Sequence, residues 1–211
     1  MPTCRYCSTC MRIHYLWKSN TLSLEKTIVV ITGGPGFGKS SVVQKLGEYH
    51  FKVANEFARE IIDEQLKTGG HKLPWKDRSG FQQAVFARRL DFYQSVKSGE
   101  LAFSDRGLPD QLAFARYRGA DLADMLDLVQ NYRYFPHVFI TPPWQEIYGT
   151  DAIRNETYEE ACGLHEIICQ TYIDLNYKLV ELPESSVETR AKFIINYLTQ
   201  QHHELIKTKI F

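Results

Sequence analysis

TIVVITGGPGFGKS, residues 27–40, is the stretch that decides the fold of this 211-residue chain. Residues 27–32 form a short β-branched run that ends at a glycine, which is typical of a buried parallel strand. Residues 33–40 then match the P-loop pattern G-x-x-x-x-G-K-S/T in full, and residues 39–49 carry apolar side chains at helical spacing. A strand before the loop and a helix after it are the setting in which this pattern binds phosphate.

The loop predicts a site for the phosphates of a nucleoside triphosphate and for Mg²⁺. Lys39 supplies a positive charge to the β- and γ-phosphates, the Ser40 hydroxyl is a Mg²⁺ ligand, and Ser41 is expected near the α-phosphate. The residues predicted to surround the nucleotide are Gly33, Gly34, Pro35, Gly36, Phe37, Gly38, Lys39, Ser40 and Ser41. ATP is the expected nucleotide, and GTP is the alternative.

Beyond this stretch, strand-like and helix-like segments alternate along the chain. Further strands are predicted at 51–55, 100–104, 137–141 and 178–182. Helices are predicted at 57–67, 81–96, 110–118, 121–130, 158–175 and 186–200. The alternation predicts a three-layer α/β fold with helices on both faces of a parallel sheet. We expect one nucleotide-binding domain at 27–200, between an N-terminal extension (1–26) and a polar tail (201–211).

The overall composition is that of an ordinary globular protein. Basic and acidic residues are equal at 25 each, so net charge gives no indication of nucleic acid or of an anionic membrane. No apolar run approaches the roughly 20 residues that span a bilayer. The N-terminal segment carries Arg5 and Arg12 among cysteines and does not resemble a signal peptide. The cytoplasm is therefore the expected compartment.

Three cysteines in the extension have the spacing of metal ligands. Cys4, Cys7 and Cys10, followed by His14, offer ligands for zinc or for part of an iron–sulfur cluster. The alternative is a disordered extension, or a start of translation at Met11.

Two acidic residues follow predicted strands. Asp105 ends an apolar strand, where a carboxylate can hold Mg²⁺ directly or through water; a role as a helix cap is the alternative. Glu56 lies just beyond the strand at 51–55. Because the carboxyl ends of parallel strands share one edge, both side chains are expected to face the γ-phosphate. Glu56 is then a candidate base for an attacking hydroxyl group.

Three arginines are candidates for contacts with the substrate. Arg59 and Arg106 are placed to hold an acceptor or phosphate, although Arg59 has Asp63 as an alternative partner on its own helix. Arg154 belongs to a loop that can close over the phosphates and stabilise the transferring group; the alternative is a solvated loop.

Two features of the sequence bear on other classes of P-loop protein. Asp105-Arg106 stands where ATP-driven motors have an Asp-Glu pair, and no N-K-x-D segment, which reads the base in Ras-like GTPases, follows a late strand. Motor ATPases and Ras-like GTPases are therefore disfavoured.

Several short segments together resemble a family of small P-loop proteins, AAA-type predicted ATPases related to the ribosylnicotinamide kinase domain of NadR. The segments are Gly33–Ser40, Glu56-Phe-Ala-Arg59-Glu60, Leu73-Pro-Trp75, Asp105-Arg-Gly-Leu-Pro109-Asp110, Pro142-Pro-Trp144, Ile147-Tyr148, and Asp151 with Arg154. The resemblance implies a kinase-type P-loop fold with sheet order 2-3-1-4-5. It also implies Mg²⁺ binding by Ser40 and Asp105 and a lid role for Arg154.

The leading hypothesis is a phosphotransferase that moves the γ-phosphoryl group of ATP to a small, nucleoside-like hydroxyl acceptor. Its catalytic residues are Lys39, Glu56, Asp105 and Arg154, with Glu56 or Asp105 as the base. Arg59 and Arg106 contact the acceptor or phosphate. The alternative is a nucleotide-dependent binding switch, or a slow NTPase, with a protein or lipid partner.

Overall fold

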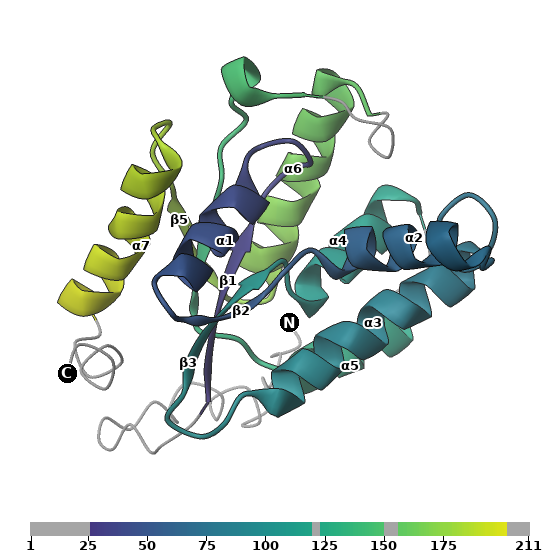
Figure 1. Cartoon of the computed structure of the whole chain (residues 1–211), viewed down its shortest axis with the longest axis horizontal. Coiled ribbons are helices and arrows are strands. Elements are labelled where there is room, and N and C mark those ends of the chain that lie inside the picture. Colours follow the sequence, from purple (N-terminus) through teal and green to yellow (C-terminus); the bar gives the residue numbers. More distant parts are fainter. Residues whose placement is uncertain (1–25, 120–122, 150–155, 202–211) are drawn as a thin grey trace, which may run out of the picture.

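The computed structural model describes residues 26–119, 123–149 and 156–201 (Figure 1). The strands are β1 (Thr27–Thr32), β2 (Lys52–Ala54), β3 (Leu101–Asp105), β4 (His137–Ile140) and β5 (Lys178–Glu181). The helices are α1 (Lys39–Glu48), α2 (Phe57–Thr68), α3 (Arg78–Ser95), α4 (Leu108–Tyr117), α5 (Ala123–Asn131), α6 (Tyr158–Asp174) and α7 (Val187–Gln201), with a 3-10 turn at Gln145–Ile147. The candidate metal ligands Cys4, Cys7 and Cys10 and the candidate lid residue Arg154 lie outside the described residues.

The strands form one parallel sheet in the order β2-β3-β1-β4-β5, which confirms the predicted topology. The central strand β1 pairs with β3, where Ile31 lies opposite Asp105, and with β4, where Ile31 lies opposite Phe139. Both β1 and β3 are almost entirely buried, as expected of apolar strands in a parallel sheet. The carboxyl ends of β1 and β3 therefore meet at one edge, which carries the P-loop and Asp105.

Helices cover both faces of the sheet, as predicted (Figure 1). Consecutive residues of a strand point to opposite faces, so Val29 and Val30 belong to different apolar clusters. Val29 packs with α1 and α7, for example with Leu46 and Ile194. Val30 lies in the cluster formed with α4, α5 and α6. None of the helices in the three described ranges is long and apolar enough to cross a membrane.

A separate, smaller apolar cluster joins α2 to the first half of α3. Ile61 and Ile62 pack there with Phe81 and Val85, and Leu73 contributes from the connecting loop. Helix α3 begins at Arg78, three residues earlier than the sequence predicts, because the Asp77 carboxylate accepts a hydrogen bond from the Gly80 N–H at 2.9 Å and caps the helix. This helix pair forms one wall of the site described next.

Candidate nucleotide and acceptor site

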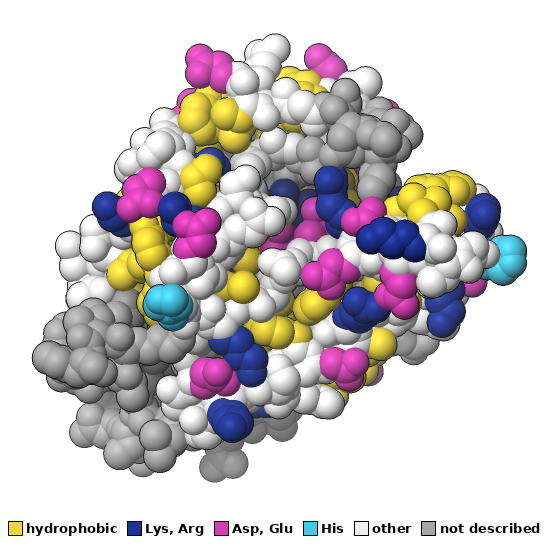
Figure 2. Space-filling view, in the orientation of Figure 1, with side chains coloured by type: hydrophobic (Ala, Val, Ile, Leu, Met, Phe, Trp, Pro, Cys, Tyr) yellow, Lys and Arg dark blue, Asp and Glu magenta, His cyan; other side chains and the backbone are white. Residues whose placement is uncertain are grey.

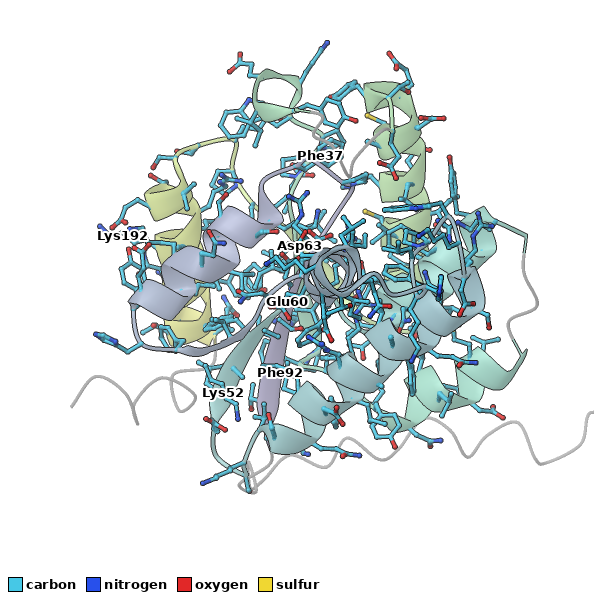
Figure 3. The ribbon with its side chains drawn as sticks, turned by 45° about the vertical axis from the view of Figure 1, so that its right-hand side comes forward. Phe37, Lys52, Glu60, Asp63, Phe92 and Lys192 are labelled. Carbon is cyan, nitrogen blue, oxygen red and sulfur yellow. The ribbon has the colours of Figure 1, made fainter. Side chains whose placement is uncertain are left out.

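The P-loop runs from β1 to α1 with the backbone that its glycines allow. Gly33 has φ +136°, and a Cβ atom there would lie 2.5 Å from the Thr141 Oγ1 atom. Gly33 therefore permits both an unusual backbone conformation and close contact with the chain after β4. Figure 3 shows Phe37 at the turn of this loop. The loop thus has the strand–loop–helix setting that the sequence predicts.

Lys39, the first residue of α1, is buried against the loop. Its Nζ atom donates a hydrogen bond to the Gly34 carbonyl at 2.6 Å. Burial and the neighbouring Arg106 lower the pKa of Lys39 to about 7, although Asp105 and Glu56 act in the opposite direction. An anion placed at the loop would favour the charged ammonium form, which is the form that binds phosphate.

Ser40 and Asp105, the two residues predicted to bind Mg²⁺, lie in direct contact. The Ser40 hydroxyl donates to Asp105 Oδ2 at 2.6 Å, and Asp105 Oδ1 is buried without a hydrogen-bond partner among the described residues. Burial and the nearby Glu56 raise the pKa of Asp105 to about 6. A hydroxyl group beside a carboxylate with an unused oxygen fits a hard cation that takes oxygen ligands.

Arg106 links the P-loop to the end of β3. It has φ +69°, an uncommon conformation for a residue with a side chain, and its guanidinium group is buried. Its Nη1 atom donates to the Gly33 carbonyl at 3.1 Å and to Asp110 Oδ1 at 2.9 Å, and its Nε atom lies 3.8 Å from Glu56 Oε1. Arg106 therefore positions the P-loop and Glu56, in addition to the predicted role near the substrate.

Asp110 anchors this network, a role that the sequence analysis did not assign. It is 0% exposed and accepts hydrogen bonds from Arg106, the Gly107 N–H, the Tyr172 hydroxyl and the Thr32 hydroxyl. Burial alone would raise the pKa of Asp110, but the guanidinium groups of Arg106 and Arg89 hold it below its ordinary value. Asp110 lies in α4 whereas Arg106 precedes that helix, so their ion pair at 2.9 Å does not follow from helical spacing.

A cavity of about 160 Å³ opens beside the P-loop residue Pro35. The predicted residues Glu56, Arg59 and Arg106 all line it. In Figure 2 positively and negatively charged side chains gather at a hollow between the P-loop region and α2. The Arg59 Nε atom lies 4.0 Å from Glu56 Oε2, so among the described residues Arg59 pairs with Glu56 and not with the alternative partner Asp63.

Arg89, Gln82 and Gln111 also line the cavity, although none of them belongs to a motif that the sequence presents. Arg89 has a recognisable signal. It follows Phe81 and Val85 at steps of four, so it occupies the buried face of α3. A charged residue at an apolar-face position is uncommon and indicates a specific partner or ligand.

His165 of α6 supports the P-loop from behind. Its Nδ1 atom accepts a hydrogen bond from the Gly34 N–H at 3.3 Å, and its ring contacts Phe37 edge-on with centroids 5.8 Å apart. The rings of Tyr148 and Tyr158 also pack around Phe37. Burial, followed by the charge of Lys39, lowers the pKa of His165 to about 4. The imidazole ring that contacts the P-loop is therefore neutral at neutral pH.

Lowering the pH is expected to reduce the stability of the folded state, because His165 is harder to protonate in the folded chain than in the unfolded chain. Its folded pKa of about 4 lies below the ordinary 6.5, so the unfolded chain binds more protons between these values. This contribution to stability is complete above pH 6.5 and is lost as the pH falls towards 4. In His165→Asn the amide oxygen can still accept from Gly34 but does not titrate. The fall in Tm on acidification should be smaller in this variant, and an equal fall would contradict the assignment.

Comparison with known proteins adds a family and a set of related folds. A sequence model of the AAA domain family matches residues 28–190. No curated protein sequence matches the chain at a significant level. Among solved structures, NadR in complex with NR is similar at 16% identity and a TM-score of 0.56, and covers 83% of this chain. This chain spans only 50% of the NadR chain.

Two smaller kinases match over nearly their whole length. Deoxyadenosine kinase from M. mycoides, with dCMP and dCDP bound, has 17% identity and a TM-score of 0.59, with coverage of 82% of this chain and 99% of its own. Shikimate kinase from Acinetobacter baumannii, in complex with shikimate, has 16% identity and a TM-score of 0.57. The match covers 84% of this chain and 95% of the shikimate kinase chain. At these identities the likeness concerns the fold, which is that of the P-loop kinases.

Proposed function

Since this chain belongs to the AAA domain family, we propose that it is a P-loop phosphotransferase, which moves the γ-phosphoryl group of ATP to a hydroxyl group of a small nucleoside-like acceptor. The observation that carries the proposal is the cavity beside the P-loop. It is lined by Glu56 and Arg106, and both residues interact electrostatically with Lys39. A hydrolase or a motor needs room only for water at this point, whereas a kinase needs a pocket for its acceptor beside the γ-phosphate.

Each residue of the network has a role in the proposed reaction. Lys39 and the P-loop N–H groups hold the β- and γ-phosphates, and Ser40 and Asp105 are the residues that would hold Mg²⁺. Bound Mg²⁺ would neutralise charge on the phosphate oxygens. Glu56 accepts the proton of the acceptor hydroxyl group while the new O–P bond forms and the P–O bond to ADP breaks. Arg154 is the proposed lid residue, and Arg59 the proposed contact to the acceptor.

A screen of ADP release tests the function directly. The full-length chain is incubated with ATP or GTP, Mg²⁺ and a panel of nucleosides and small hydroxy acids, and ADP or GDP formation is followed. At least one compound should raise the rate well above the background without acceptor. If none does while the nucleotide binds tightly, the phosphotransferase proposal fails, and a nucleotide-dependent switch or slow NTPase takes its place.

Glu56→Gln should lower kcat by about 10²- to 10⁴-fold, the usual contribution of a general base, with little change in nucleotide affinity. The matched control is Glu60→Gln on the same helix, whose carboxylate pairs with the half-exposed Arg88 at 3.6 Å. That control should keep the wild-type rate. If Glu56→Gln keeps the wild-type kcat, Glu56 is not the general base of the reaction.

A further inference from the structure

The wall of the cavity beside the P-loop carries more positive than negative side chains. The charged residues that line it are Arg59, Arg89, Arg106 and Arg118, with Glu56 and Glu156. The arginines come from four separate parts of the fold, namely α2, α3, the end of β3 and the C-terminus of α4. Figure 2 shows Lys and Arg side chains inside and around the hollow. A cavity with this balance of charge attracts anions.

The two arginines nearest the P-loop have carboxylate partners. Arg106 lies 2.9 Å from Asp110 and 3.8 Å from Glu56, and Arg59 lies 4.0 Å from Glu56. Arg89 and Arg118 form no ion pair with any residue in the described part of the chain. The positive charge in excess therefore lies on the side of the cavity formed by α3 and α4.

Arg89 contributes a buried positive charge to that side. It is only 4% exposed, and burial lowers the pKa of its guanidinium group while the nearby Asp110 acts in the opposite direction. Asp110 is itself paired with Arg106. A buried charge without a close partner is unfavourable, and an anion in the cavity would offset this cost through space, with no need for a direct hydrogen bond.

Arg118 contributes an accessible positive charge at the mouth of the cavity. Its side chain is exposed, and it follows the last residue of α4. Partial burial and then the charge of Arg78, the first residue of α3, lower the pKa of Arg118, whereas Glu156 acts in the opposite direction. Two like charges thus lie near each other at the ends of different helices. An anionic ligand would relieve their repulsion and form charge-assisted hydrogen bonds with Arg118.

This positive mouth is separated from the proposed site of phosphoryl transfer. Glu56 and Arg106 mark that site, because both interact electrostatically with Lys39. On α4, Asp110 holds Arg106, and Arg118 follows Gln111 by seven residues, which is about 10 Å along a helix. The charge of Arg118 is therefore not needed to balance Glu56 or Asp110, and it is placed for the far end of an acceptor.

We propose that the acceptor carries an anionic group, a carboxylate or a phosphate, which binds to Arg118 at the mouth of the cavity while its hydroxyl group lies at Glu56. Arg89 strengthens the attraction from the α3 side of the wall. The inference rests on the proposed function for the position of the hydroxyl group. It restricts the acceptor to hydroxy compounds that carry a negative charge.

Binding by the full-length chain tests the inference with pairs of compounds that differ in the charged group. Calorimetry in the presence of ADP and Mg²⁺ compares shikimate with methyl shikimate and orotidine with uridine for a carboxylate, and deoxycytidine monophosphate with deoxycytidine for a phosphate. In at least one pair the anion should bind at least about tenfold more tightly than its neutral partner, because a hydrogen bond to a charged group is lost in the neutral compound. The pair that shows the preference identifies the anionic group.

The outcomes separate this inference from the proposed function. If no anion binds, or if each neutral compound binds as tightly as its anionic partner, the inference is overturned. ADP release stimulated equally by both members of a pair would leave the phosphotransferase standing without an anion site. A preferred anion that binds without stimulating ADP release from ATP would support the anion site and contradict the phosphotransferase.

A pair of variants tests Arg118 itself. Arg118→Gln should lower affinity for the preferred anion at least about tenfold and leave affinity for its neutral partner unchanged. Arg116→Gln is the matched control, because it removes the same charge from the same helix but from a side chain that pairs with Asp174 at 2.6 Å. It should bind the anion normally. Unchanged anion affinity in Arg118→Gln would overturn the assignment, as would an equal loss for the anion and the neutral compound.

Discussion

Replacing Lys39 by alanine is expected to lower phosphoryl transfer by at least about 10²- to 10³-fold, the effect of removing one preorganised group that stabilises transition-state charge. Lys39 donates a hydrogen bond to the P-loop carbonyl of Gly34, and burial together with the charge of Arg106 has already lowered its pKa to about 7. Its replacement therefore removes a poorly solvated charge and should not lower Tm. Steady-state kinetics and thermal unfolding of the same preparation measure the two effects separately.

Lys45→Ala is the matched control for this variant. Lys45 lies on the same helix, but its ammonium group is at the surface and pairs with Glu48 and Glu188. It should retain wild-type turnover. Equal turnover in Lys39→Ala and wild type would exclude the P-loop from the reaction, however well the sequence pattern matches.

Asp110→Asn should cause the largest loss of stability of any conservative change in the site. It leaves Arg106 buried without its closest carboxylate, 2.9 Å away, and breaking a buried ion pair from one side costs about 3–5 kcal/mol. For a chain of this size the loss corresponds to a fall in Tm of roughly 6–20 °C. Because the displaced Arg106 also holds the Gly33 carbonyl, nucleotide affinity should fall as well.

The chain offers a second Asp–Arg pair as a control. Asp174 accepts from Arg116 at 2.6 Å, but both side chains are partly exposed. Asp174→Asn should change stability little, because exposed ion pairs are screened by solvent. Denaturant unfolding of both variants, with unchanged m-values, measures the difference. Similar losses would show that burial does not set the strength of the Arg106–Asp110 pair.

The sequence was sufficient for those parts of the site that depend on short, contiguous patterns. Residues 33–40 carry their phosphate chemistry in their order, and the apolar run of β3 pointed to Asp105 at its end. The contact between Ser40 and Asp105 follows once β1 and β3 are neighbours, and the sheet order that makes them neighbours came from the family resemblance. Strand adjacency over more than 60 residues is not encoded in any local period.

The acceptor side of the site was harder to predict because it depends on how helices pack. Arg89 and Gln111 face one cavity only because α3 lies against α4, and neither residue belongs to a motif. The Asp110 network likewise joins β1, α4 and α6 through single side chains. The start of α3 was misplaced by three residues because its capping aspartate lies within a polar loop, where capping and turn residues look alike.

The close packing of Gly33 against Thr141 bears on the thermodynamics of nucleotide association. The loop is held by the chain after β4, by the Arg106 guanidinium group and by the imidazole behind Gly34, so its shape is set by the protein itself. Association then avoids most of the conformational entropy loss that ordering a free loop would impose. Triphosphate affinity should accordingly respond steeply to ionic strength, through charge screening, and only weakly to agents that rigidify loops.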